Sequence, residues 1–175
     1  VVLTVDPGQA FGTGTHETTK MCLRFIEDAF DAPAPPRTVL DVGTGTGILG
    51  IAAAMLGAER VLGIDIDPKA VETASENGRI NGVAGRFEAG VTPLSRIEGS
   101  YDLVVANVLA EILADLKEEV GARCASGGAL VLSGILAEKS DWVAQEYAEA
   151  GWALAGRREE GQWSALLLRR KDGPA

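Results

Sequence analysis

The chain has 175 residues, the size of one domain, and its 16 basic and 25 acidic side chains give a formal net charge of −9. This acidic balance argues against direct binding to nucleic acid, whose phosphates attract basic surfaces. The apolar content is 46%, and the sequence has no uninterrupted apolar run of the ~18 residues that a membrane helix needs. Disorder and membrane spanning are therefore excluded.

Helices and strands are predicted to alternate along the chain. Apolar side chains recur in steps of four from Met21 to Phe30 and predict a helix over residues 17–30, which the three prolines of residues 32–37 end. Further helices are predicted over residues 48–56, 68–81, 110–124 and 138–150. Strands are predicted over residues 38–42, 61–66, 86–89, 101–107, 129–133, 152–157 and 163–169.

Strands that alternate with long helices form a parallel sheet covered on both faces. Residues 158–162 are polar and favour a hairpin turn, so the last two strands are expected to be antiparallel. The predicted fold is α/β, a doubly wound, Rossmann-like sheet that is mostly parallel and ends in an antiparallel C-terminal hairpin. We expect residues 1–175 to form a single domain and residues 171–175 to be a frayed tail.

The two cysteines, Cys22 and Cys124, are far apart in apolar, helix-like segments. This context predicts small buried side chains rather than a metal pair or a disulfide, and so a reducing, cytoplasmic setting. The chain starts in a strand-like segment without Met and lacks the pattern of a signal peptide, so we expect that a preceding domain has been removed.

The 22 glycines are well above the usual share of ~7% and are concentrated in residues 8–14 and 43–50, where we expect ligands. The second stretch contains Gly-x-Gly-x-Gly over residues 43–47, directly between a predicted strand and a helix. At such a turn the glycine backbone approaches a nucleotide closely. Asp65, near the end of the next strand, is placed to accept both ribose hydroxyls, whereas Asp67 is expected to cap the helix that follows.

Two kinds of nucleotide fit such a loop. The glycines within residues 45–50 satisfy the dinucleotide pattern, but that pattern starts at the glycine that leaves the strand, and counted from Gly43 its third required position is Ile48. Asp41, two residues before Gly43, suits the cationic end of a ligand rather than a pyrophosphate. S-adenosylmethionine carries an ammonium and a sulfonium, so it is favoured over a nicotinamide dinucleotide.

Two more segments are expected to converge on the glycine loop. Residues 6–19 form a polar, glycine-rich stretch that runs into a helix, and Asn107 ends a strand at the same carboxyl edge as Gly43 and Asp65. Phe11 lies among glycines and threonines rather than on an apolar face, which favours a ring that covers a ligand.

These segments resemble the bacterial methyltransferases of ribosomal protein L11, a family of class I S-adenosylmethionine-dependent methyltransferases. The matching stretches are Asp-Pro-Gly-Gln-Ala-Phe-Gly-Thr-Gly-Thr-His from residue 6, Leu-Asp-Val-Gly-Thr-Gly-Thr-Gly-Ile-Leu from residue 40, Ala-Asn-Val-Leu-Ala from residue 106 and Ser-Gly-Ile-Leu from residue 133. Nearly the whole chain is covered. The resemblance implies that a further, N-terminal domain of the family, which recognises the substrate protein, is absent from this chain.

The resemblance also implies the site residues. It places cofactor contacts at Thr19, Gly43, Asp65 and Asn107, with Phe11 and residues 12–16 covering the cofactor, and the glycine motif adds Gly45. A target lysine has a pKa of ~10.4 and must lose its proton before it reacts. An apolar channel lowers that pKa, and the Asn107 side-chain carbonyl can accept an N–H bond, which makes Asn107 the predicted catalytic residue.

Methyl transfer is an in-line displacement, so holding the nitrogen, methyl and sulfur collinear at ~3 Å needs no strong general base. His16, the single histidine of the sequence, either accepts a proton, contacts the cofactor or caps a helix, and these alternatives stay open.

The sequence therefore predicts an S-adenosylmethionine-dependent protein N-methyltransferase that acts on lysine or N-terminal amino groups of ribosomal protein L11. The acidic charge suits a lysine-rich ribosomal partner. No metal site is expected. The alternatives are a methyltransferase for another lysine-bearing protein, a nicotinamide-dependent oxidoreductase, and a cofactor-binding module without activity.

Overall fold

The computed structural model describes residues 2–6 and 16–171, and within them it contains six α-helices and seven strands. The helices are α1 (Glu17–Asp31), α2 (Ile48–Leu56), α3 (Pro68–Ile80), α4 (Ala110–Asp115), α5 (Lys117–Ala122) and α6 (Ser140–Glu149). The strands are β1 (Thr38–Val42), β2 (Arg60–Ile64), β3 (Phe87–Gly90), β4 (Tyr101–Asn107), β5 (Cys124–Leu136), β6 (Trp152–Glu160) and β7 (Trp163–Arg170). Short 3-10 helices occupy Leu94–Arg96 and Ala137–Lys139.

The strands form one sheet in the order β3-β2-β1-β4-β5-β7-β6. β1 to β5 run parallel, and β7 lies antiparallel between β5 and β6. This arrangement confirms the predicted doubly wound sheet with its antiparallel C-terminal hairpin. From β1 the chain builds outward first to β2 and β3 and then, on the other side, to β4 and β5. In open α/β sheets, ligands bind at the carboxyl ends of the strands where this order reverses.

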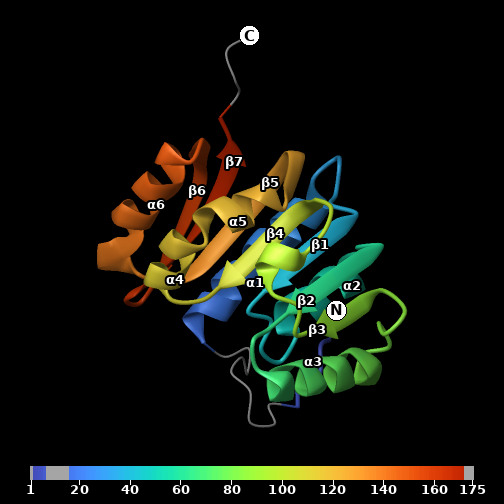
Figure 1. Ribbon diagram of the computed structural model, residues 1–175. Coiled ribbons are helices and arrows are strands. Elements are labelled where there is room, and N and C mark those ends of the chain that lie inside the picture. The colour runs from blue at the N-terminus through green and yellow to red at the C-terminus, as the bar shows by residue number, and fades with distance from the viewer. Residues whose placement is uncertain (1, 7–15, 172–175) are drawn as a thin grey trace.

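Helices cover both faces of the sheet, with α4, α5 and α6 in front of the strands and α1 behind them (Figure 1). Successive side chains of a strand point to opposite faces of the sheet, so each central strand contributes to two hydrophobic layers, one under each set of helices. Val39 of β1 packs in the cluster that contains α1, while its neighbour Leu40 packs in the cluster that contains Leu113 of α4. The central strands are thus buried on both sides, which is why they are continuous apolar runs in the sequence.

Several predicted elements differ from the observed ones. The predicted helix 110–124 is two helices that meet at Leu116, and the bend lets both Leu113 and Val120 reach full burial in the core. The predicted strand 129–133 is the much longer β5, because its ends pair with β4 and β7. The predicted turn 158–162 is shorter, since β6 continues to Glu160 opposite Trp163.

The predicted strand 61–66 is also wrong at its end. β2 stops at Ile64, so Asp65 and Ile66 lie beyond the sheet, in the connection to α3. The two cysteines are free and buried, as expected. In the part of the chain that the structure describes, no helix is long and apolar enough to cross a membrane, and no cluster of three or more His, Cys, Asp or Glu side chains could hold a metal ion.

Two asparagines one turn apart, Asn77 on α3 and Asn81 at its C-cap, bind the N-terminal segment to the rest of the protein. Asn77 is fully buried; its Oδ1 accepts from the Asp6 amide at 3.0 Å, and its Nδ2 donates to the Asp6 carbonyl at 3.0 Å and the Thr46 carbonyl at 2.9 Å. Asn81 binds the amide and the carbonyl of Thr4 in the same way. Asn77 therefore connects the N-terminal segment with the glycine loop.

We predict that Asn77→Ala destabilises the protein more than Asn81→Ala does. The first substitution removes three hydrogen bonds in a buried position, at about 1 kcal/mol each, so the free energy of unfolding should fall by about 3 kcal/mol. Water can replace the bonds of the more exposed Asn81, so its loss should stay near about 1 kcal/mol. Urea denaturation of the two variants measures the difference, and equal losses would contradict the assignment of Asn77.

Candidate functional site

The glycine loop leaves β1 at the carboxyl edge of the sheet. Gly43, Gly45 and Gly47 have φ angles of 72°, 55° and 83°, in the left-handed region that other residues rarely adopt. The amides of Gly43 and Thr44 both donate to the Ile64 carbonyl of β2, at 2.8 and 2.9 Å. The loop is therefore tied to the end of the neighbouring strand, and exposed Gly43 and half-buried Gly45 are the glycines that a ligand at that edge can reach.

Asp41 holds this loop from inside. Its carboxylate is only 1% exposed, and its Oδ2 accepts from the Thr44 hydroxyl at 2.7 Å and from the Gly50 amide at 3.0 Å. Gly50 lies in the first turn of α2, where amides have no partner within the helix. A side chain from β1 thus supplies the acceptor that the N-cap residue of α2, a glycine, cannot. That Asp41 also faces a cationic ligand stays a prediction.

Burial of Asp41 raises its pKa to about 6, with the nearby charge of Asp65 adding to the effect and the bonds from Thr44 and Gly50 opposing it. Between pH about 4 and 6 the folded protein therefore keeps a proton that the unfolded chain has released. Stability falls as the pH rises through this interval and stays constant above it.

We predict the corresponding pH dependence for Asp41→Asn. The free energy of unfolding of the wild type, taken relative to this variant, should decrease by about 2 kcal/mol between pH 4 and pH 7, because the amide does not titrate. Denaturant titrations of both proteins at several pH values give this difference. A difference that is flat, or that grows with pH, would contradict a raised pKa.

Asp65 lies just beyond β2, near enough for its charge to raise the pKa of Asp41. One carboxylate oxygen accepts from the Gly45 amide and the other from the Asp67 amide, both at 3.0 Å. The structure thus brings Asp65 and the glycine loop together, and each oxygen keeps a further lone pair for a hydroxyl donor. Asp67 accepts from the Lys69 amide at 2.9 Å and is the N-cap of α3, as predicted.

Asn107 ends β4 and is connected to the start of α1. Its Nδ2 donates to Thr18 Oγ1 at 3.3 Å, and that hydroxyl lies 2.8 Å from His16 Nδ1. His16 is the N-cap of α1, accepting from the Thr18 amide, and its ring packs edge-on against Trp163 at 5.1 Å. Because the amide nitrogen of Asn107 serves Thr18, its oxygen is the end of the side chain that can serve another donor.

Of the two remaining predicted site residues, the structure describes Thr19 but not Phe11. Thr19 is buried in the first turn of α1, next to Thr18. Phe11 lies outside the described residues. Thr18 is a site residue that the sequence does not predict, since nothing in the sequence distinguishes the two adjacent threonines. Only the packing of α1 against β4 selects Thr18 as the partner of Asn107.

Three exposed apolar side chains at the same edge were also missed. Ile66 follows β2 and is 97% exposed, Val91 follows β3 and is 52% exposed, and Leu109 lies just after β4 and is 60% exposed. The strand order puts the first two on one side of the glycine loop and Leu109 on the other. Such side chains can contact the apolar parts of a ligand. Ile66 is not among the predicted site residues because the sequence pattern places it inside the strand predicted over residues 61–66.

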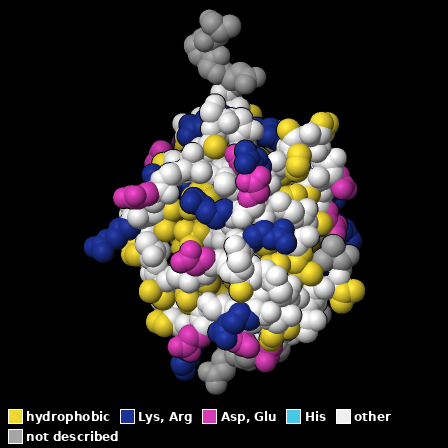
Figure 2. All heavy atoms as spheres, turned by 90° about the vertical axis from the view of Figure 1, so that its right-hand side faces the viewer, with side chains coloured by type: hydrophobic (Ala, Val, Ile, Leu, Met, Phe, Trp, Pro, Cys, Tyr) yellow, Lys and Arg dark blue, Asp and Glu magenta, His cyan; other side chains and the backbone are white. Residues whose placement is uncertain are grey.

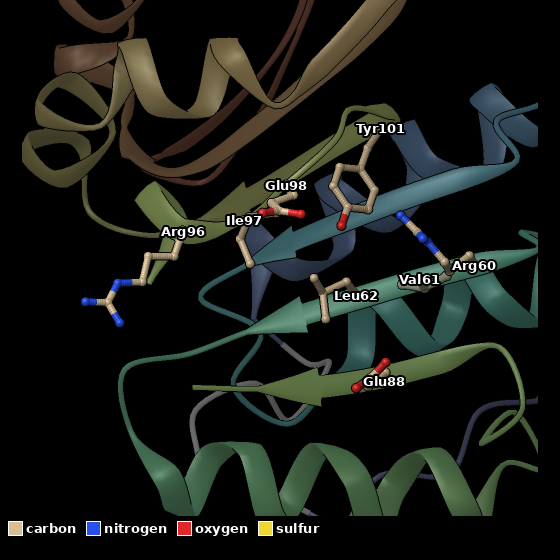
Figure 3. Close-up of a pocket in the computed structure, with 8 residues that line it drawn as sticks. All are labelled: Arg60, Val61, Leu62, Glu88, Arg96, Ile97, Glu98 and Tyr101. Atoms are coloured by element: carbon tan, nitrogen blue, oxygen red, sulfur yellow. The ribbon is translucent and has the colours of Figure 1, made fainter. Parts of the chain in front are cut away.

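A shallow hollow of about 240 Å³ lies elsewhere, toward the amino ends of β2 and β4 (Figure 3). The Arg60 guanidinium there lies 5.6 Å from the centre of the Tyr101 ring. The hollow is lined by Arg60, Val61, Leu62, Glu88, Arg96, Ile97, Glu98 and Tyr101. Basic and acidic side chains balance in it, and it is remote from the glycine loop, so the candidate site is the carboxyl edge.

Figure 2 likewise shows basic and acidic side chains interspersed on the face that it displays.

The sheet order, the antiparallel β7 and the glycine loop after β1 define the class I methyltransferase fold. The chain belongs to the ribosomal protein L11 methyltransferase (PrmA) family, whose model matches residues 1–171. The family predicted from the motifs is thereby confirmed.

Similar proteins support this family assignment. The ribosomal protein L11 methyltransferases of Geotalea daltonii and Geotalea uraniireducens are 48% and 49% identical to it, over 96% and 97% of this chain and 56% of each relative. The crystal structure of ribosomal protein L11 methylase from Lactobacillus delbrueckii subsp. bulgaricus is 38% identical, with a TM-score of 0.90 over 98% of this chain and 86% of that one. The chain spans a little over half the length of the curated relatives.

Proposed function

We propose that this chain is the catalytic domain of an S-adenosylmethionine-dependent methyltransferase that modifies amino groups of ribosomal protein L11. The observation that carries the proposal is that Asp65, the glycine loop and Asn107 meet at one edge of the sheet in a member of this family. The relatives' names supply the substrate. A nicotinamide-dependent oxidoreductase would leave Asn107 and its bond to Thr18 without a role.

The residues at the edge fit the proposed cofactor. The Asp65 carboxylate has lone pairs for two ribose hydroxyls, and the positive φ angles of the three glycines give the loop after β1 the tight turn that lets its backbone approach a nucleotide. The exposed side chain of Ile66, next to Asp65, suits the flat apolar face of a purine. When bound, S-adenosylmethionine supplies an electrophilic methyl group on its sulfonium. Thr19 and Phe11 complete the proposed set of cofactor contacts.

Asn107 holds the target nitrogen. A lysine amine with an ordinary pKa of ~10.4 is almost wholly protonated near neutral pH, so the site has to favour the neutral form. The exposed apolar side chain of Leu109, two residues on, offers a surface against which a bound amine loses part of its hydration, and this loss lowers the pKa of the amine. Asn107 Oδ1 accepts one N–H bond, and the bond from its Nδ2 to Thr18 fixes the amide in that orientation. The nitrogen lone pair is then aimed at the methyl group.

The direct test is an assay of methyl transfer to purified ribosomal protein L11, followed by mass spectrometry, with a second lysine-bearing protein as control. Methylation of L11 and not of the control supports the proposal. Methylation of both would favour a broader substrate range. Binding of NADH in place of S-adenosylhomocysteine would overturn the assigned class.

For cofactor binding, we predict that Asp65→Ala lowers the affinity of the protein for S-adenosylhomocysteine by at least tenfold. The substitution removes one or two hydrogen bonds to a charged acceptor, each worth ~1.5–3 kcal/mol. Isothermal titration calorimetry measures the affinity. Asp67→Ala is the matched control, because Asp67 caps α3 and should leave the affinity within about threefold of wild type. Unchanged affinity in Asp65→Ala would remove the ribose assignment.

For transfer, Asn107→Ala should lower kcat by about 100-fold at saturating cofactor, because the amine loses the group that orients it. The free energy of unfolding should change by no more than about 1 kcal/mol, since the lost bond to Thr18 is long and partly exposed to water. Asn81→Ala, an asparagine remote from Asn107, should keep its kcat. Full activity of Asn107→Ala would contradict the role in amine positioning.

A further inference from the structure

Val108, the residue after Asn107, touches two glycines from different parts of the chain. A Cβ atom built on Gly43 would lie 2.6 Å from Val108 Cγ1. A Cβ atom built on Gly134 would lie 2.3 Å from the Val108 carbonyl oxygen, 2.7 Å from its carbonyl carbon and 3.0 Å from its nitrogen. The main chain of Val108 therefore passes directly over the bare α-carbon of Gly134.

The contact with Gly134 follows from how β4 and β5 pair. Asn107 is in register with Ser133, and the Val108 amide donates to the Ser133 carbonyl at 3.1 Å. The next residue of β5, Gly134, has a φ of 83° and lies half-buried beneath the peptide of Val108. Val108 is thus held against β5 by this hydrogen bond and by a contact that leaves no space for a side chain at position 134.

We propose that Gly134 is a positioning residue for methyl transfer, because it sets the place of the turn that carries Asn107. The proposal rests on the function proposed above, in which Asn107 Oδ1 orients the amine. An ordinary contact is at least 3.4 Å, so a Cβ at 134 would have to move the Val108 peptide by roughly 1 Å. The neighbour is rigid main chain rather than the end of a flexible side chain. A displacement of about 1 Å in a reacting group can reduce a rate by about 100-fold.

The chain offers a closely matched control in the same strand. Gly127 has a φ of 78°, against 83° for Gly134, so an alanine is strained to a similar extent at both positions. Among the described residues, no heavy atom lies within 4 Å of a Cβ built on Gly127 beyond its own neighbours in the chain. The two alanine variants therefore differ in the contact with Val108 and share the backbone strain.

The experiment compares Gly134→Ala with Gly127→Ala. Backbone strain should lower the Tm of both variants, and Gly134→Ala should lose more because its methyl group also displaces the Val108 peptide. We expect a kcat about 100-fold below wild type for Gly134→Ala at saturating cofactor and substrate, and a kcat within about twofold of wild type for Gly127→Ala. The KM for the protein substrate should change little in either variant. A kcat of Gly134→Ala within about threefold of that of Gly127→Ala would overturn the proposal.

A second measurement does not depend on activity. The side-chain NH2 resonances of Asn107, assigned by their absence in Asn107→Ala, should shift in Gly134→Ala and stay in place in Gly127→Ala. Unshifted resonances in Gly134→Ala would overturn the proposal even if the wild type showed no methyl transfer. A wild type without transfer, together with shifted resonances, would instead count against the proposed function alone.

Should Gly134→Ala fail to fold, the double variant Gly134→Ala with Val108→Gly replaces it. A glycine at 108 frees the peptide to move away from the new methyl group, so folding should return while kcat stays low. A folded double variant with the kcat of the wild type would show that the position of this turn does not control the rate, and would overturn the proposal.

Discussion

A buried carboxylate at the end of the central strand is the interaction on which the site depends. Asp41 connects β1, the glycine loop and the first turn of α2 through a single oxygen, and burial raises its pKa to about 6. Keeping a charge there is costly for stability, since desolvation favours the neutral form. The same carboxylate fixes the conformation of the loop through the Thr44 hydroxyl and the Gly50 amide, and a ligand does not have to displace these buried hydrogen bonds. Binding to such a preorganised loop loses less conformational entropy.

The order of the strands places Asp65 and Asn107 relative to the loop that Asp41 holds. The chain order reverses next to β1, so the loop after β1 lies between Asp65 on one side and Asn107 on the other. Each of these side chains is tied to a neighbouring segment: Asp65 to the Gly45 amide and Asn107 to Thr18 at the start of α1. Side chains that are fixed by rigid elements hold a reacting group more accurately than side chains on free loops. Methyl transfer needs mainly this kind of accuracy, because it is an in-line displacement.

Much of the fold was predictable because its pattern is local. The strands Thr38–Val42 and Tyr101–Asn107 and the helix Ile48–Leu56 were predicted with their observed bounds, since each is a short apolar run between clear breaks. The predictions failed where pairing with a distant strand decides the outcome. β5 extends to Cys124–Leu136 because β4 and β7 supply partners at its two ends, and no local pattern reports that. The helix predicted over residues 110–124 likewise bends to suit the core beneath it.

By itself, the sequence determined the glycine loop, the acid near the end of the second strand, the asparagine that ends the fourth and hence the family, because these residue types at these spacings serve one kind of ligand edge. Only the tertiary structure decided how they are held. It selected Thr18 over Thr19 as the partner of Asn107, brought Asn77 to the Thr46 carbonyl, and placed Gly134 under the Val108 peptide. The physical reason is that each of these contacts joins segments far apart in the chain, and their distance is set by how helices pack on the sheet and how its strands align.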